Sequence, residues 1–166
     1  VEYAEITANG QLGDWKKTTE LNTYVQGAAA IAQNGYLYVI GGKAAGSGLK
    51  TVQFAPIKAD GSLGSWVQTS PMNVSRSSFS AAVYNGYMYV VGGYNGGFTG
   101  VIGSVEYARI MTNGTLKPWS KTSPMNPAWG AGLAVNNGYI YSMGGYGEMG
   151  SMKTASYASI NSNGSI

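Results

Sequence analysis

Hydrophobic and polar positions follow a pattern that recurs about every fifty residues along the chain. Each copy opens with a short run of small apolar residues, GAAAIA, SFSAAVY or GAGLAV, and an Asn-Gly pair follows soon after it. A nearly continuous apolar run comes next, YLYVIGG, YMYVVGG or YIYSMGG. Asn-Gly favours a tight type I′ hairpin turn because both residues tolerate positive φ. The pattern therefore predicts two antiparallel strands per copy, the second of them covered on both faces.

The second half of each copy predicts two more strands. A variable glycine-rich loop leads to TVQFAPI, SVEYARI or TASYASI, and an Asn-Gly or Asp-Gly turn then leads to GSWVQTS or KPWSKTS. The last of these segments is polar apart from its Trp, which suits an exposed outer edge. Gly and Pro recur too often for long helices, and no segment has a convincing apolar period of 3.6 residues. We therefore expect an all-β chain with four strands in each complete copy.

Four markers keep the period, namely NGY, the double glycine, a Trp in the fourth segment and an aromatic in the third. They begin at Asn34, Asn85 and Asn137; Gly41, Gly92 and Gly144; Trp15, Trp66 and Trp119; and Tyr3, Phe54, Tyr107 and Tyr157. A period of this length indicates a repeat architecture, and four-stranded antiparallel units packed side by side are the blades of a β-propeller. A unique site would not be copied three times. We therefore interpret the recurring aromatics as contacts between blades, at Trp15, Trp66, Trp119, Tyr38, Tyr89, Tyr141, Phe54 and Tyr107.

The repeat resembles the kelch motif, with a double glycine after an apolar strand, an aromatic some thirteen residues later and then a Trp. The closest copy is NVSRSSFSAAVYNGYMYVVGG followed by SVEYARIMTNGTLKPW, and it contains the Arg that kelch repeats place before the first strand, Arg76. Other copies have Val25 or Gln26 and Ala128 or Trp129 there, and the His frequent in kelch repeats is absent. The phrase ADGSLGSW is similar to a bacterial secreted variant of kelch propellers. The resemblance implies a kelch-like propeller and no particular activity, since one fold hosts many.

The repeat boundaries divide the chain into two complete blades with partial blades on either side. Residues 1–22 supply strands three and four, residues 23–73 and 74–126 supply complete blades, and residues 127–166 supply strands one to three. A closed propeller has about four to eight blades, so this chain of about three blades forms an open fan. Such a fan exposes apolar blade faces at both ends. We expect further blades to cover them, either from a longer chain or from a second copy that pairs head to tail.

Composition excludes several classes of function. Charged residues make up 10% of the 166 residues, the net charge is +3, and no basic run is longer than Lys16-Lys17, so we expect no nucleic-acid partner. No apolar stretch is long enough to span a membrane. The chain has no Cys and no His, which removes thiolate and imidazole catalysis and the usual zinc sites, and we expect no cofactor. Low charge with many Thr, Ser, Asn and Tyr residues suggests an extracellular or cell-surface protein of bacterial type.

Strand order determines which loops share a face of the propeller. The tight turns lie on one face, and the variable loops that join strands two and three, or one blade to the next, lie on the other. Rigid scaffolds commonly carry binding residues on such loops. Trp129 is the most informative candidate, because its counterparts are small or polar. The candidate ligand-binding residues on this face are Tyr24, Gln26, Arg76, Tyr94, Asn95, Phe98, Trp129, Tyr146 and Glu148.

Trp129 and Arg76 are predicted to lie near the channel mouth on adjacent blades, where an aromatic plane beside an Arg suits a sugar ring or a peptide. Two structural alternatives stay open at this point. Trp129 can plug the channel mouth or pack on Pro127, and Arg76 can donate hydrogen bonds to loop carbonyls.

The leading hypothesis is a non-catalytic binding or scaffold propeller that contacts protein or glycan. The alternative is a structural subunit of a larger ring, fibre or surface layer, because heterologous contacts that fail to close make filaments. An enzyme is not predicted. Galactose oxidase, a kelch-like propeller, needs His and a Cys–Tyr pair, and sialidase-type propellers need an Arg cluster, whereas this chain has only Arg76 and Arg109. Asp60 aligns with Asn9, Asn113 and Asn163, so we interpret it as a turn residue and not as a catalytic acid.

Overall fold

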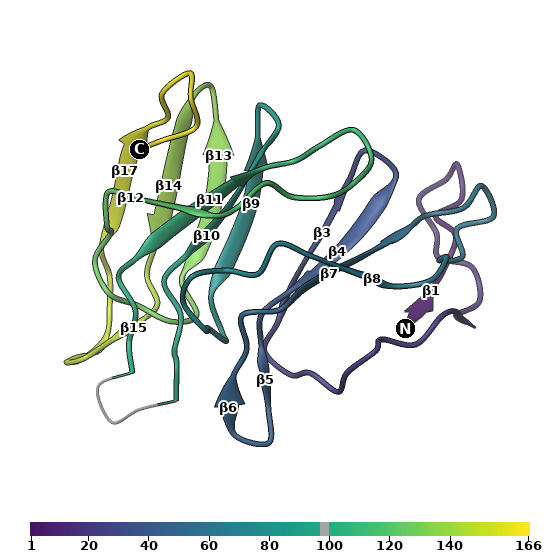
Figure 1. The fold of residues 1–166 in the computed structure, drawn as a ribbon, viewed down its shortest axis with the longest axis horizontal. Helices are drawn as coiled ribbons and strands as arrows, with labels where there is room; N and C mark the ends of the chain where they lie inside the picture. Colours follow the sequence, from purple (N-terminus) through teal and green to yellow (C-terminus); the bar gives the residue numbers. More distant parts are fainter. Residues whose placement is uncertain (97–99) are drawn as a thin grey trace.

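A computed structural model describes residues 1–96 and 100–166 of the chain, and these residues fold into antiparallel β-structure throughout. None of the described residues forms a helix that is long and apolar enough to cross a membrane. The main sheets stand side by side like the leaves of an open fan, and the two termini lie at opposite ends of it (Figure 1). The predicted fold class, an open set of about three propeller blades, is confirmed.

Two complete sheets of four strands lie in the middle of the fan, each with its strands in chain order from the inside outwards. The second blade consists of β3 (Ala29–Gln33), β4 (Tyr36–Ile40), β7 (Val52–Pro56) and β8 (Val67–Thr69). The third blade consists of β9 (Ser80–Tyr84), β10 (Tyr87–Val91), β11 (Val105–Arg109) and β12 (Ser120–Thr122).

Smaller sheets stand at the two ends of the fan. The N-terminal blade has two strands, β1 (Glu2–Tyr3) and β2 (Lys16–Lys17), and the C-terminal blade has three, β13 (Gly132–Asn136), β14 (Tyr139–Met143) and β17 (Ala155–Ser159). Strands β3 and β13 both pack against β9, which makes the first strands of three blades neighbours at the centre. Their small side chains allow this close approach, as the sequence predicts for strands that line a channel.

Two short ribbons extend from loops in which the sequence predicts no strands. They are β5 (Lys43–Ala44) with β6 (Ser47–Gly48) in the second blade, and β15 (Tyr146–Gly147) with β16 (Gly150–Ser151) in the C-terminal blade. Two residues per strand are too few to give an alternating pattern, so the sequence carries no signal for them. In the third blade Tyr94 forms an isolated bridge with Val101 at the same place. Phe98 lies outside the described residues.

The hairpin turns between the first two strands of each blade have the geometry that Asn-Gly predicts. Asn34 and Gly35 have φ of 50° and 78°, and the two later Asn-Gly pairs match them closely. The turns between strands three and four differ, because only their glycine has positive φ. In one of these turns the Asp60 carboxylate accepts hydrogen bonds from the backbone N–H and the hydroxyl of Ser62, at 3.0 and 2.7 Å, and these bonds lower its pKa. Asp60 is therefore a turn residue, as predicted.

Three of the turn glycines between strands three and four, Gly61, Gly114 and Gly164, pack on an aromatic ring of the preceding blade. The Tyr38 hydroxyl donates to the Gly114 carbonyl at 2.8 Å, and the Tyr89 hydroxyl donates to the Gly164 carbonyl at 2.9 Å. A Cβ on Gly114 would lie 2.7 Å from the Phe54 ring, closer than real Cβ contacts allow. Glycine is therefore required at this position by packing as well as by φ.

The recurring Trp residues hold neighbouring blades together. The indole N–H of Trp66 donates to the Thr19 carbonyl at 3.2 Å, and that of Trp119 donates to the Ser70 carbonyl at 2.9 Å. Both side chains are 6% exposed, which confirms the predicted contact between blades. Trp15 is 65% exposed, because the described residues include no blade before the N-terminal one. The prediction of a buried blade contact for Trp15 is therefore wrong within this chain.

Tyr38 and Tyr89, whose hydroxyls donate hydrogen bonds across blade interfaces, lead us to expect a loss of stability at alkaline pH. Burial, with a smaller effect of neighbouring tyrosines, raises the pKa of Tyr38 and of Tyr89 to about 12, whereas the unfolded value is about 10. Between pH 10 and 12 the unfolded chain loses these protons first. The stabilisation linked to these two hydroxyls is therefore fully present below pH 10. Above pH 10 the free energy of unfolding falls by up to about 1.4 kcal/mol per pH unit for each tyrosine.

Urea unfolding measured from pH 8 to pH 12 checks this expectation, with the double variant Tyr38→Phe, Tyr89→Phe as control. The variant should be less stable at pH 8 and should have a shallower slope above pH 10. Equal slopes for the two proteins would show that these hydroxyls do not control the alkaline transition.

Candidate functional site

The variable loops of the blades gather at one end of the fan, which we call the loop face. In Figure 1 the ribbons β5–β6 and β15–β16 project from the lower end, and the Asn-Gly turns lie at the upper end. Short backbone pairings join the two kinds of loop, at Gln26 with Lys43, Ser77 with Tyr94, and Trp129 with Tyr146. Gln26, Ser77 and Trp129 therefore occupy equivalent positions in successive blades, which places Val25 and Ala128, and not Gln26 and Trp129, at the position of Arg76.

A chain of backbone hydrogen bonds connects these positions across three blades. The Ser78 N–H donates to the Gly27 carbonyl, and the Gly130 N–H donates to the Ser78 carbonyl, both at 2.8 Å. Ser78 has φ of 52°, whereas its equivalents are glycines with φ of 64° and 67°. A non-glycine residue in this region costs about 1–2 kcal/mol. Strain of this kind clusters at functional sites, and here it places a hydroxyl where the other blades have none.

Ser78 and Trp129 line a pocket of about 340 Å³ together with Lys43, Ser77 and Tyr94, which we call the central pocket. Trp129 is 38% exposed, and its ring packs on Tyr146 with a centroid separation of 5.3 Å and an angle of 39° between the planes. Within the described part of the chain no carboxylate forms an ion pair with Lys43. The central pocket thus combines an aromatic plane, an ammonium group and hydroxyls.

Two further hollows lie on the loop face beside the central pocket. One of about 410 Å³ is lined by Tyr24, Gln26 and Lys43, so it shares Lys43 with the central pocket, and Tyr24 is almost fully exposed. The other, of about 480 Å³, lies beside β15–β16 and is lined by Pro127 and Glu148 among others. The loop face therefore offers a series of concave surfaces.

The structure brings several predicted candidates together on this face and leaves others apart. Tyr94 and Trp129 line the central pocket, Tyr146 supports Trp129, Tyr24 and Gln26 line the adjoining hollow, and Glu148 lies in the third. Asn95 is exposed, and its backbone N–H donates to Gly100 at 3.0 Å.

Sequence reasoning missed Lys43, Ser77 and Ser78. Ser78 had a usable signal, because it replaces a glycine that the equivalent positions retain. Lys43 directly follows the double glycine of its own repeat and had no such signal.

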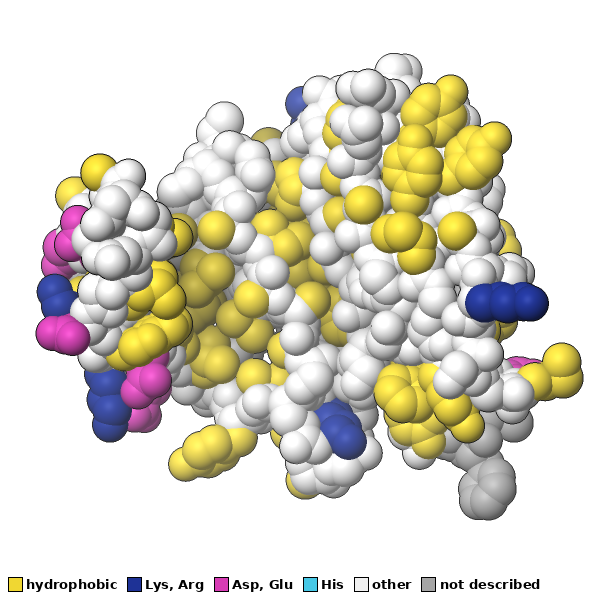
Figure 2. All heavy atoms as spheres, turned by 180° about the vertical axis from the view of Figure 1, so that it is seen from behind, with side chains coloured by type: hydrophobic (Ala, Val, Ile, Leu, Met, Phe, Trp, Pro, Cys, Tyr) yellow, Lys and Arg dark blue, Asp and Glu magenta, His cyan; other side chains and the backbone are white. Residues whose placement is uncertain are grey.

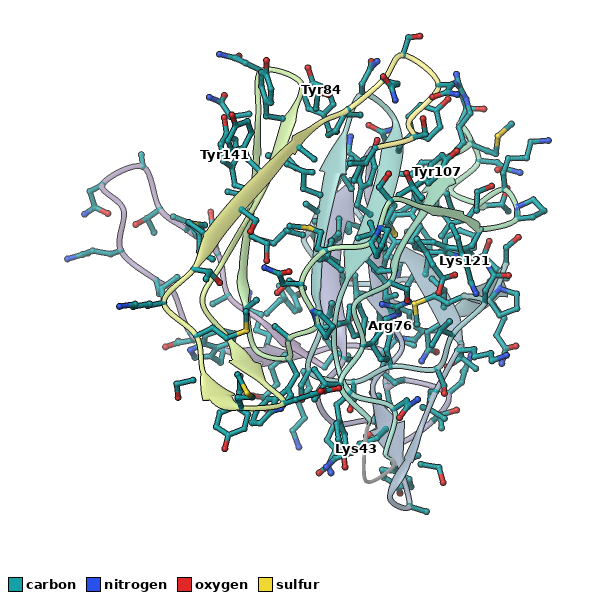
Figure 3. All side chains as sticks on the ribbon, turned by 90° about the vertical axis from the view of Figure 1, so that its left-hand side faces the viewer. Lys43, Arg76, Tyr84, Tyr107, Lys121 and Tyr141 are labelled. Carbon is teal, nitrogen blue, oxygen red and sulfur yellow. The ribbon has the colours of Figure 1, made fainter. Side chains whose placement is uncertain are left out.

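Arg76 lies inside the fold and not at the channel mouth, which corrects its predicted position. Its guanidinium donates to the Gly92 carbonyl at 2.7 Å and to the Ser104 carbonyl at 3.0 Å, and it pairs with the Glu106 carboxylate at 2.7 Å. Both charged side chains are fully buried, and Figure 3 shows Arg76 well inside the fold, above Lys43. Desolvation lowers the pKa of Arg76, and the bond and charge of Glu106 oppose this shift.

Glu106 completes the network by holding the loop before the third blade. Its carboxylate accepts hydrogen bonds from the backbone N–H groups of Asn73, at 2.7 Å, and Val74, at 3.0 Å. The Arg76–Glu106 pair therefore fixes the loop between the second and third blades to the body of the third blade. This arrangement matches the alternative in which Arg76 bonds to loop carbonyls.

Among residues 1–96 and 100–166, no three His, Cys, Asp or Glu side chains are grouped as metal ligands would be. The two complete blades contain two acidic residues. The Glu106 carboxylate bonds to Arg76 and to the loop backbone, and the Asp60 carboxylate bonds within its own turn.

Comparison with known proteins finds matches to kelch-repeat sequences. Residues 75–107 match the family model described as the Kelch motif. An F-box/kelch-repeat protein of Arabidopsis thaliana is 32% identical over 120 residues, which cover 72% of this chain and 31% of that protein. Kelch-like protein 41a of Danio rerio is 33% identical over 99 residues, covering 60% of this chain and 16% of the relative.

A third relative matches over a longer stretch. Kelch-like protein 38 of Homo sapiens is 28% identical over 140 residues, covering 81% of this chain and 22% of the relative. The chain therefore spans less than a third of the length of each of these curated relatives.

Proposed function

We propose that this chain, which carries kelch repeats folded into an open part of a β-propeller, is a non-catalytic binding module that holds a protein segment on its loop face. The observation that carries the proposal is the partly exposed Trp129, whose ring packs on Tyr146 at the edge of the central pocket. Trp and Tyr side chains supply a large share of the energy at protein interfaces.

Trp129 differs from the other Trp residues in its relation to the repeat. Trp66 and Trp119 recur at one repeat position and are buried between blades, whereas the equivalents of Trp129 are Gln26 and Ser77. A polar residue serves at the same position in two other blades, so the blade fold does not need an indole there. We therefore assign Trp129 to ligand contact in preference to packing.

The shape of the loop face favours a peptide segment over a compact ligand. The central pocket adjoins the hollow at Tyr24 through Lys43, and the third hollow lies next to β15, whose Tyr146 supports Trp129. An extended segment can cross such a surface with its side chains in successive hollows, and Lys43 would favour an anionic group at the centre. The kelch-like and F-box/kelch-repeat relatives are consistent with a binding role.

A glycan is the second candidate ligand. The exposed indole of Trp129 next to the polar side chains of Ser78 and Tyr94 provides an apolar plane bordered by hydrogen-bonding groups, which suits the face and the hydroxyls of a sugar. The bacterial and extracellular setting that the composition suggests stays a prediction.

Selection of a displayed random-peptide library against the chain, together with a glycan array, tests the ligand class. We expect peptides whose affinity for the Trp129→Ala variant is at least tenfold lower, a loss of about 1.4 kcal/mol, as for an interface anchor. Trp15→Ala is the matched control, because it removes an exposed Trp from the N-terminal blade, away from the loop face. Selected peptides that bind the Trp129→Ala variant as tightly as the unmodified chain would refute the site, and selective binding of glycans alone would favour the second candidate.

A second part of the proposal concerns assembly of the propeller, because the fan is open at both ends. The N-terminal and C-terminal blades lack the neighbours that the middle blades have, so we propose that further blades complete the ring, from a longer chain or from a second copy.

A further inference from the structure

Asn-Gly pairs occupy two kinds of turn in this chain, and the two kinds differ in how they hold the glycine nitrogen. One kind joins the first two strands of a blade, and the other follows its third strand. Asn-Gly is the dipeptide at which asparagine deamidates most readily, because glycine has no side chain to shield the backbone nitrogen that attacks the asparagine side chain. The pairs of the first kind begin at Asn34, Asn85 and Asn137, and those of the second kind at Asn9, Asn113 and Asn163.

Deamidation of asparagine takes two steps and needs only water as a co-reactant. The glycine nitrogen gives up its proton and attacks the asparagine Cγ, so an N–Cγ bond forms, the Cγ–Nδ2 bond breaks, and the side-chain nitrogen leaves as ammonia. Water then adds to one of the two carbonyls of the resulting succinimide and breaks the bond of that carbonyl to the ring nitrogen, which gives aspartate or isoaspartate. The first step therefore requires an unbonded glycine N–H and a peptide plane that can rotate toward the asparagine side chain.

The turns at Asn34 and Asn85 meet the first requirement. Both asparagines are exposed, and among the described residues no acceptor takes a hydrogen bond from the N–H of Gly35 or Gly86. No atom lies within 4 Å of a Cβ built on either glycine. Figure 2 shows mostly polar side chains and backbone at the upper end of the middle blades, where these turns lie. Solvent and base therefore reach the attacking nitrogen.

The same two turns also allow the peptide plane to rotate. Asn34 and Gly35 have φ of 50° and 78°, which is the type I′ geometry. Rotation of the peptide plane between them gives a type II′ turn, with ψ of about −120° at the asparagine, and this places the glycine nitrogen next to the side chain. Type II′ also closes a two-residue hairpin, so the flanking strands keep their positions during the rotation.

The turn at Asn113 meets neither requirement. The Gly114 N–H donates to the Met111 carbonyl at 3.0 Å, and rotation of the Asn113–Gly114 peptide plane would break this bond. The Gly114 carbonyl accepts a bond from the buried Tyr38 hydroxyl at 2.8 Å, which fixes the glycine against the preceding blade. The Asn113 Oδ1 accepts bonds from the N–H and the hydroxyl of Thr115, at 3.1 and 2.7 Å, so the side chain is held as well.

We propose that Asn34, Asn85 and the equivalent Asn137 are deamidation sites of the folded chain, and that Asn113 is protected. Each event replaces an amide with a carboxylate and lowers the net charge of +3 by one. Isoaspartate also adds a methylene to the backbone of the turn, and turn length sets the register of a hairpin. The sites lie at the end of the fan opposite the loop face, so this inference does not depend on the proposed ligand binding (Figure 1).

Peptide mapping of the folded chain after incubation at mildly alkaline pH tests the assignment, because trypsin places the three asparagines in separate peptides. We expect Asn34 and Asn85 to convert to aspartate and isoaspartate. Asn113 should react at least about tenfold more slowly, the effect of one or two hydrogen bonds that must break first. In concentrated urea all three should react at similar rates, since each precedes glycine. Equal rates in the folded chain, a stable Asn34 or Asn85, or protection of Asn113 that persists in urea would each overturn the proposal.

Asp60→Asn supplies a matched variant, because it creates an Asn-Gly pair in a turn of the protected kind. The Gly61 N–H donates to the Lys58 carbonyl at 2.9 Å, as the Gly114 N–H does to its own turn. We expect the introduced asparagine to keep its amide in the folded chain and to lose it in urea. Deamidation of the introduced asparagine as fast as that of Asn85 in the folded chain would refute the protecting role of the glycine N–H bond.

Discussion

Replacing Arg76 with Ala should lower the free energy of unfolding by about 3–5 kcal/mol, because Arg76 is fully buried in an ion pair. The substitution leaves the Glu106 carboxylate buried without its countercharge, and breaking one half of a buried ion pair typically costs that much. It also removes the bonds to the Gly92 and Ser104 carbonyls that hold the loops of the third blade. Urea unfolding monitored by tryptophan fluorescence measures the loss.

The second blade supplies a matched control for this prediction. Val25 and Gln53 occupy the positions of Arg76 and Glu106 there, so the same backbone accepts a neutral pair. The double variant Arg76→Val, Glu106→Gln should therefore recover most of the stability that Arg76→Ala loses, because no buried charge remains uncompensated. A double variant less stable than Arg76→Ala would show that the bonds of the Glu106 carboxylate to the Asn73 and Val74 N–H groups matter more than its uncompensated charge.

Arg76 also shows where sequence reasoning reaches its limit. The repeat pattern singles out this residue, because other copies have Val, Gln, Ala or Trp nearby. It predicts a position near the channel mouth, with hydrogen bonds to loop carbonyls as the structural alternative, but it does not indicate a buried ion pair. Its partner Glu106 lies on a strand next to a repeated aromatic, and nothing local in the sequence links the two residues. Only the pairing of β10 with β11 brings the carboxylate under the loop. The ion pair thus depends on tertiary geometry.

The blades themselves could be predicted because their signals are local and repeated. Asn-Gly turns, apolar runs and glycine pairs each determine a short segment, and the copies reinforce one another. The central pocket had weaker signals, because it is assembled from residues of three blades that lie far apart in the sequence. Trp129 was found because it breaks the repeat, and Ser78 breaks the repeat in the same way by replacing a glycine. Comparing equivalent loop positions is therefore the most productive search for binding residues in this chain.

Replacing Trp119 with Ala should cost about 3–5 kcal/mol of the free energy of unfolding, whereas Trp15→Ala should cost less than about 0.5 kcal/mol. The two residues hold the same repeat position, but Trp119 is 6% exposed and bonded to Ser70 of the preceding blade, and Trp15 is 65% exposed. Urea unfolding below 1 µM protein, where association between copies is weakest, measures both losses. Equal losses would contradict the assignment of the repeated Trp to blade contacts.

The difference between the two Trp variants measures what one blade contributes to its neighbour. In a repeat protein the total stability is approximately the sum of a term for each repeat and a term for each interface between neighbours. Trp15 and Trp119 share the first kind of term and differ in the second, because only Trp119 has a preceding blade to pack on. A protein in which one additional blade is fused before residue 1 should therefore make Trp15→Ala nearly as costly as Trp119→Ala. If that cost stayed below about 0.5 kcal/mol, the N-terminal blade would have to pack on its neighbour in a different way from the two complete blades.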